Sequence, residues 1–261
     1  MTTNKLDMRL IDTHCHFDHP KFDADRSELV QAMQKAGVTD LIFPAVTAAG
    51  WGKLKQLTDS SDYFHASYGL HPMFIRAHHD KDIEQLHKWL EDEQPVAVGE
   101  CGLDFYIADP DKEKQIALFK QQLHLAKEFD LPLIIHARKS MDIVLKHIRQ
   151  LGSLRGVIHS FSGSQQQADQ LIEQGFYLGV GGTITHERAK RLRRIISTAP
   201  PERLLLETDA PDQPDSHWTG KRNEPARLAF IASVLAELTE SSIEHIAELT
   251  TTNAKRLFGI A

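Results

Sequence analysis

Short apolar runs and amphipathic stretches alternate along almost the whole chain. The apolar runs predict strands, and the stretches between them carry apolar residues at three- and four-residue intervals, as Ile116, Phe119 and Leu123 do. The predicted strands span residues 9–16, 40–46, 63–70, 95–103, 131–138, 156–162, 176–184 and 203–209. The predicted helices between and after them span residues 27–37, 52–60, 81–93, 112–130, 141–152, 165–175, 187–197 and 226–240.

This alternation is typical of an α/β protein of the (β/α)8 or TIM-barrel class, which needs about 250 residues. A doubly wound open sheet alternates in the same way, but it carries a glycine-rich phosphate-binding turn after its first strand. Here that turn reads HCHFDHP and contains no GxGxxG. We therefore predict a single TIM-barrel domain over residues 1–261, with residues 242–260 as a C-terminal helical extension packed outside the barrel.

Side chains that can bind metals gather at the carboxyl ends of the predicted strands, where the active sites of barrels lie. His14 and His16 end the first strand, and alternation turns both toward the barrel axis while Cys15 points away. The other strand ends carry His71, Glu100, His136, His159 and Asp209. One such histidine is more often a satisfied polar residue than a ligand. Seven polar groups converging on one cavity would be costly unless a cation or water satisfied them.

The predicted ligands are all nitrogen and oxygen donors, which suits Zn²⁺, Mn²⁺, Co²⁺, Ni²⁺ or Fe²⁺, and Mg²⁺ less well. Six ligands are more than one catalytic cation with an open position would take, so we predict two divalent metal ions per chain with a carboxylate bridging them. The six are His14, His16, Glu100, His136, His159 and Asp209, with His71 in reserve.

Composition limits the partners. The formal net charge of −6 argues against a broad basic face for nucleic acid, although it allows a phosphate substrate to bind through metal and a local cationic rim. Two cysteines cannot form a disulfide framework, and a cytoplasmic location is expected. We see no apolar run of the ~18 residues that a membrane span needs, and no obligate protein partner is evident.

Six segments resemble, in chain order, motifs of the TatD family of metal-dependent hydrolases. They are DTHCH, GLHP, GECGLDF, LPLIIHAR, HSFSGS and ETDAP, and RNEP and the final helix continue the match. The resemblance implies a two-metal TIM barrel with deoxyribonuclease activity, either 3′→5′ exonuclease or related phosphodiesterase action. The loop DQPDSHWTGKRNEP departs from many family DNases, which have an aromatic residue or leucine after the proline of ETDAP. Together with GVGGTIT, it resembles the less characterised YjjV-like branch, so the substrate stays open.

The resemblance also implies a role for each candidate residue. His14, His16, Glu100 and Asp209 would hold one metal ion. Glu100, His136 and His159 would hold the other, with Glu100 as the bridge. Asp209 would also act as general base for the attacking water, and His71 would lie near the scissile phosphate rather than on a metal.

Three further residues are candidates for binding substrate. Arg138 follows His136 by two and could reach a phosphate, with a rim ion pair as the equal alternative. Ser162 belongs to a small-residue turn that could offer hydrogen-bond donors or simply cap a helix. Arg222, the third candidate, lies in the long loop after the eighth strand. A separate residue, Glu207, would either orient a metal ligand or form a buried structural pair.

Three function classes follow from these residues. The first is a phosphodiesterase acting on nucleic-acid ends or on a small phosphoester. The second is a hydrolase of a small amide, ester or lactone, because the same activated water attacks carbonyl groups. The third is a noncatalytic metal-binding barrel, which would give Asp209 no purpose.

Overall fold

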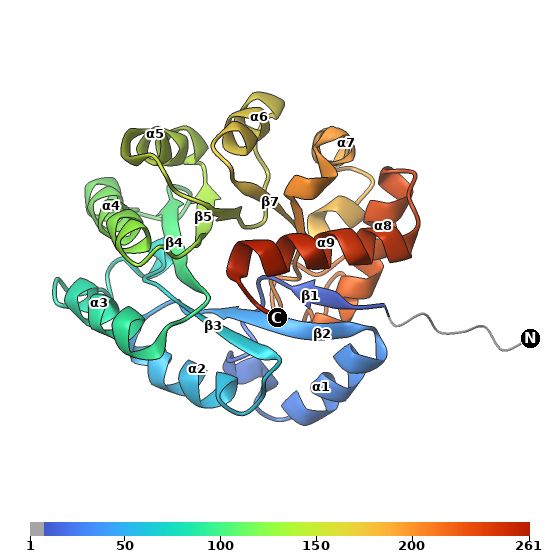
Figure 1. The fold of residues 1–261 in the computed structure, drawn as a ribbon, viewed down its shortest axis with the longest axis horizontal. Coiled ribbons are helices and arrows are strands. Elements are labelled where there is room, and N and C mark those ends of the chain that lie inside the picture. Colours follow the sequence, from blue (N-terminus) through green and yellow to red (C-terminus); the bar gives the residue numbers. More distant parts are fainter. Residues whose placement is uncertain (1–7) are drawn as a thin grey trace, which may run out of the picture.

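The strands close into a barrel. The computed structural model describes residues 8–261, in which eight parallel strands follow one another in chain order (Figure 1). They are β1 (Leu10–Asp12), β2 (Val38–Pro44), β3 (Phe64–Tyr68), β4 (Ala97–Asp104), β5 (Leu133–Arg138), β6 (Gly156–Ile158), β7 (Tyr177–Val180) and β8 (Leu204–Leu206). The backbone N–H of Thr13 donates to the Leu206 carbonyl over 3.0 Å, which joins the last strand to the first. The TIM-barrel prediction is confirmed.

Helices surround the strands, and their apolar faces bury the outer core (Figure 1). They are α1 (Arg26–Lys35), α2 (Trp51–Thr58), α3 (Asp82–Glu93), α4 (Lys112–Glu128), α5 (Met141–Leu151), α6 (Gln165–Glu173), α7 (Lys190–Thr198), α8 (Leu228–Leu238) and α9 (Ile243–Phe258). Short 3₁₀ turns are η1 (Pro20–Phe22), η2 (Ala48–Gly50), η3 (Pro72–Phe74), η4 (Gly182–Thr185), η5 (Pro201–Arg203) and η6 (Pro225–Arg227). Within residues 8–261, none of the helices has the length and apolar character of a membrane span.

Six of the eight strands end earlier than the sequence predicted, and the candidate ligands of β1, β6 and β8 lie beyond the ends of those strands. The first was expected to reach His16, the sixth residue 162 and the eighth Asp209, but β1, β6 and β8 end at residues 12, 158 and 206. The chain beyond each end leaves the regular ladder, yet backbone hydrogen bonds still fix it. The Asp209 N–H donates to the His14 carbonyl over 2.8 Å, and the His16 N–H to the Ala210 carbonyl over the same distance. Cross-strand backbone bonds, rather than strand alternation alone, therefore hold the polar residues in place.

The C-terminal helix covers one end of the barrel, rather than packing outside it as the sequence predicted. Leu257 and Phe258 of α9 pack against a second apolar cluster, separate from the core between strands and helices. Its strand members come from most of the ring: Ile11, Ile42, Ala97, Ile134, Val157, Tyr177 and Leu205. The hydroxyl of Thr251 donates to the Arg9 carbonyl just before β1, so α9 lies across the amino-terminal end (Figure 1). The opposite end is left for a site.

Asn253 offers a test of how α9 is attached. Its buried Nδ2 donates to the carbonyls of Pro201 and Leu204 over 3.0 and 2.9 Å. Asn253→Ala should destabilise the protein by about 2 kcal/mol in urea unfolding, because two carbonyls lose a buried donor. A single cooperative transition is expected, as for one domain. Thr252→Ala, at an exposed position of the same helix, is the control and should leave the midpoint nearly unchanged. Two separate transitions would contradict the single-domain prediction.

Candidate metal centre

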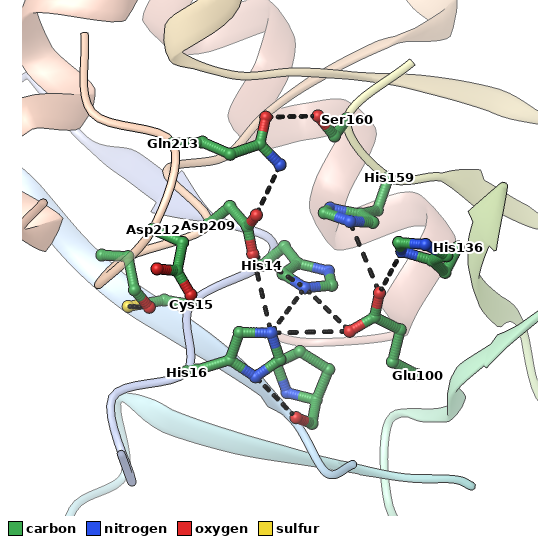
Figure 2. Close-up of polar contacts among 12 residues, drawn as sticks. His14, Cys15, His16, Glu100, His136, His159, Ser160, Asp209, Asp212 and Gln213 are labelled. Atoms are coloured by element: carbon green, nitrogen blue, oxygen red, sulfur yellow. Dashed lines mark hydrogen bonds and ion pairs between the residues drawn. The ribbon is translucent and has the colours of Figure 1, made fainter. Parts of the chain in front are cut away.

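A cavity of about 730 Å³ opens at the carboxyl ends of the strands. Its lining includes six of the seven polar residues that the sequence singled out: His16, His71, Glu100, His136, His159 and Asp209. The seventh, His14, is fully buried, and its ring stacks on that of His159 with centroids 3.8 Å apart. The structure therefore brings together residues from six strand ends, far apart in the sequence, and Figure 2 labels all of them except His71.

The first group of donor atoms faces one oxygen of Glu100. Oε2 of Glu100 lies 3.3 Å from Nε2 of His14 and 3.5 Å from Nε2 of His16. Oδ1 of Asp209 lies 3.5 and 3.6 Å from the same two nitrogens (Figure 2). Between the two histidines, the buried thiol of Cys15 points toward the Ala210 carbonyl, 3.8 Å away, and packs in the outer core as the sequence predicted.

The second group faces the other oxygen of the same carboxylate. Oε1 of Glu100 lies 3.2 Å from Nδ1 of His136, 3.4 Å from Nε2 of His159 and 3.0 Å from Nε2 of His71. Burial alone would raise the pKa of Glu100, but the surrounding histidines hold it well below its usual range. A buried anion thus lies between two sets of imidazole nitrogens.

These donor atoms fit divalent cations. Oε2 of Glu100 is buried without a hydrogen-bond partner, and Nε2 of His14 and Nε2 of His16 face each other at 3.2 Å, where at most one proton fits between them. Three groups of potential ligand atoms each lie within 4.8 Å of one another: those of His14, Glu100 and His159, those of His14, His16 and Asp209, and those of His71, Glu100 and His136. Nitrogen and oxygen donors left facing one another in this way are what a cation of the zinc or manganese type would satisfy.

Hydrogen bonds on the far side of the rings orient two of the histidines. Nε2 of His136 lies 3.0 Å from Oδ2 of Asp104, and Nδ1 of His16 lies 3.1 Å from the Pro44 carbonyl. Each partner accepts a hydrogen bond from the ring N–H, so the opposite nitrogen of each ring presents its lone pair to the centre. Sequence reasoning missed Asp104, although it lies four residues after Glu100 on the same face of β4, and that spacing could have identified it.

His71 is held in a different way. Its Nδ1 accepts the backbone N–H of Met73 over 3.1 Å, so the ring proton resides on Nε2 and is donated to Oε1 of Glu100. Burial lowers the pKa of His71 to about 4, which leaves the ring neutral near pH 7. Nε2 of buried His78 donates in turn to the His71 carbonyl over 2.8 Å. In this tautomer, His71 offers the cavity an N–H donor rather than a metal-binding lone pair.

Asp209 is fixed through its second oxygen. Oδ2 accepts Nε2–H of Gln213 over 2.5 Å, and Oε1 of Gln213 accepts the hydroxyl of Ser160 over 2.7 Å (Figure 2). All three residues have φ in the left-handed region, at 58°, 48° and 47° for Asp209, Gln213 and Ser160. Such conformations are uncommon outside glycine and cluster at functional sites. The sequence marked the Gln213 loop only as a departure from a family pattern and did not predict this contact.

Glu207 lies below the centre. Its buried carboxylate has Oε1 3.4 Å from Nδ1 of His159 and accepts the backbone N–H of Ser160. Gly179 of β7 makes room for it, because a Cβ there would lie 2.4 Å from Oε2 of Glu207. Of the two predicted roles, this position favours orientation of His159.

Comparison with known proteins agrees with this geometry. A sequence model of the family described as TatD related DNase matches residues 11–259. The chain belongs to the TatD family. Among TatD relatives, YjjV of Escherichia coli (strain K12) is 42% identical over 97% of this chain and 98% of its own length. YabD of Bacillus subtilis (strain 168) is 33% identical over 96% of this chain and 99% of its own length. Both are named uncharacterized metal-dependent hydrolases.

The fold agrees with a solved TatD structure as well. The crystal structure of Escherichia coli YjjV, a TatD homologue, superposes with a TM-score of 0.94 at 40% identity, covering 98% of this chain and all of that one. The predicted family and its YjjV-like branch are confirmed. The chain is a metal-dependent hydrolase with histidine, glutamate and aspartate side chains placed to bind metal.

Two of the three candidate substrate-binding residues line the cavity, and the third does not. Arg138 and Ser162 line the cavity, and the guanidinium of Arg138 stacks over Tyr106, 3.9 Å from the ring centroid. Arg222 is not among the lining residues. Its guanidinium instead binds both carboxylate oxygens of Asp25 and lies 3.2 Å from Glu224, because the loop folds back toward the start of α1. We therefore leave Arg222 out of the substrate-binding set.

Substituting the central carboxylate tests the number of metal ions. Wild-type protein dialysed against Mn²⁺ or Zn²⁺ should retain two ions per chain by elemental analysis. Glu100→Gln should retain at most one, because an amide offers one neutral oxygen in place of two anionic ones. Saturating metal should also raise the melting temperature of the wild type more than that of the variant. Glu128→Gln, at an exposed surface pair with His87, is the control. Two ions in Glu100→Gln would rule out the bridge.

Proposed function

We propose that this TatD-family hydrolase is a nuclease that cleaves phosphodiester bonds at the ends of nucleic-acid strands. The observation that carries the proposal is the position of Glu100, whose two oxygens face separate groups of donor atoms. One carboxylate shared by two cations about 3.5–4 Å apart is an arrangement used by phosphatases and nucleases. Such a pair suits a phosphoryl group, which has several oxygens to bind.

In this proposal, one cation would be held by His14, His16, Glu100 and Asp209, and the other by His136, His159 and Glu100. When bound, the cations would lower the pKa of a water molecule and offset negative charge on the phosphoryl oxygens. The donor set leaves the metal open among Zn, Mn, Co, Ni, Fe and Mg.

The side chains of the chain itself supply the proton transfer. Asp209 accepts the proton of the attacking water on Oδ2, the oxygen that Gln213 holds in place. Burial raises the pKa of Asp209, which favours proton acceptance, and the Gln213 N–H stabilises its ionised form. The Nε2–H of His71, which Oε1 of Glu100 accepts in this structure, would turn to a phosphoryl oxygen once substrate is bound, and Arg138 and Ser162 bind the flanking substrate at the cavity wall.

One assay tests the reaction class. Metal-loaded protein is incubated with oligonucleotides labelled at the 3′ end, beside a panel of small amides, esters and lactones. The oligonucleotides should be cleaved, and Asp209→Asn should lower kcat by at least about a hundredfold, because the water loses its base. Circular dichroism serves as the control that the variant is folded. Turnover of the carbonyl panel alone would overturn the nuclease proposal, and wild-type rates in Asp209→Asn would overturn the role of the base.

Gln213 should act through Asp209 rather than on substrate. Gln213→Met keeps the length of the side chain but removes its N–H, so kcat should fall by about tenfold while KM and metal content stay unchanged. Ser160→Ala should have a smaller effect in the same direction. The double variant should be no slower than Gln213→Met, because Ser160 acts only through the amide. Independent, multiplying effects would contradict this chain of hydrogen bonds.

A further inference from the structure

Large apolar side chains lie exposed at the mouth of the metal centre. Met73, Phe74 and Tyr106 are 50, 42 and 60% exposed, and they are three of the four exposed large hydrophobics in the described part of the chain. Met73 and Phe74 line the cavity, and so does Arg138, whose guanidinium covers the Tyr106 ring. The fourth, Tyr63, precedes β3 and so lies at the opposite end of the barrel. The exposed apolar surface is thus concentrated beside the site.

Both aromatic rings are anchored to residues of the centre. Phe74 belongs to η3, which His71 caps, and its ring lies edge-on to that of His71 with centroids 6.0 Å apart. Tyr106 follows β4, and its N–H donates over 2.9 Å to Asp104, the residue that orients His136. These contacts place both aromatic residues next to side chains of the centre.

Two parts of the cavity lining differ in chemistry. The part of the lining beside β3 to β5 presents the Phe74 ring, the Met73 thioether and the Arg138 guanidinium, which lies over the Tyr106 ring. The rest of the lining includes Asp18, Asp212 and Gln213, which offer charge and hydrogen bonds, together with His19, Pro20 and Pro211. Aromatic and guanidinium faces bind planar rings, and they stack bases of any sequence. The two acidic side chains would repel a phosphate backbone, so a bound strand has one favourable side.

We propose that Met73, Phe74, Tyr106 and Arg138 form a base platform, on which the nucleobase next to the scissile phosphate stacks. This inference rests on the proposed nuclease function. Stacking needs an uncovered base face at that position, as in a single-stranded or frayed end, because a base within a duplex has both faces covered. The cavity of about 730 Å³ falls in the size range of sites that enclose small ligands.

Matched oligonucleotides test the platform. One carries ordinary nucleotides, and the other carries an abasic residue beside the scissile bond. Wild-type enzyme should cleave the abasic strand about tenfold less efficiently, by kcat/KM, as expected for one lost stacking contact. Phe74→Leu and Tyr106→Leu should lose about the same factor on the ordinary strand and little on the abasic one. Phe74→Trp should retain wild-type efficiency. Tyr63→Ala, which changes an exposed aromatic residue at the other end, should match the wild type.

A binding measurement gives a second readout. Fluorescence anisotropy with the slow variant Asp209→Asn should show weaker binding of the abasic strand, and Phe74→Leu in that background should remove the difference. Equal wild-type cleavage of both strands would overturn the platform and leave the nuclease proposal intact. Cleavage of neither would overturn the nuclease proposal itself. A change of oligomeric state in Phe74→Leu, measured by light scattering, would assign this surface to an interface between copies instead.

Discussion

A carboxylate buried among imidazoles is the constraint on which this site depends. Glu100 lies on β4 with one percent of its surface exposed, and its oxygens face nitrogens of five histidines from four other strand ends. An isolated ion pair at this depth would be costly, and removing one partner would leave an uncompensated charge. The histidines around Glu100 offset its charge, and the ring nitrogens of the four other than His71 make the same cluster a place for cations.

The rest of the barrel keeps this cluster in register. Asp12 of β1 accepts the N–H and the hydroxyl of Thr208 over 2.9 and 2.6 Å, which ties the seam between the first and last strands just below Asp209. Burial raises the pKa of Asp12 to about 8, so this carboxyl group stabilises the seam by hydrogen bonds more than by charge. At the amino-terminal end, α9 fills the barrel mouth with Leu257 and Phe258. The apolar packing of α9 thus closes the amino-terminal end of the barrel, and the candidate metal ligands lie at the carboxyl end.

Partners beyond the metal ligands decide how the ligands are used. Asp104 and the Pro44 carbonyl hold the ring protons of His136 and His16 on the nitrogen that faces away from the centre, whereas the Met73 N–H leaves the proton of His71 on the nitrogen that faces Glu100. The same imidazole chemistry therefore yields lone pairs toward the centre in one place and a hydrogen-bond donor in another. Gln213 orients Asp209 in a similar way. Its N–H is donated to Oδ2 of the carboxylate, and Oδ1 faces the histidines.

The order of strands, the ends at which polar residues gather and the family were all readable from the sequence, because periodicity and motif spacing are local properties. Contacts between segments that lie far apart in the chain could not be read from the sequence. The position of α9 depends on apolar residues of many strands that meet inside the barrel. Arg222 pairs with Asp25 instead of lining the cavity because its loop folds back toward a residue 197 positions earlier in the sequence. Gln213, Asp104 and Phe74 gained their meaning in the same way. The sequence alone determined which side chains could do chemistry, and the closed barrel decided which atoms of each face one another.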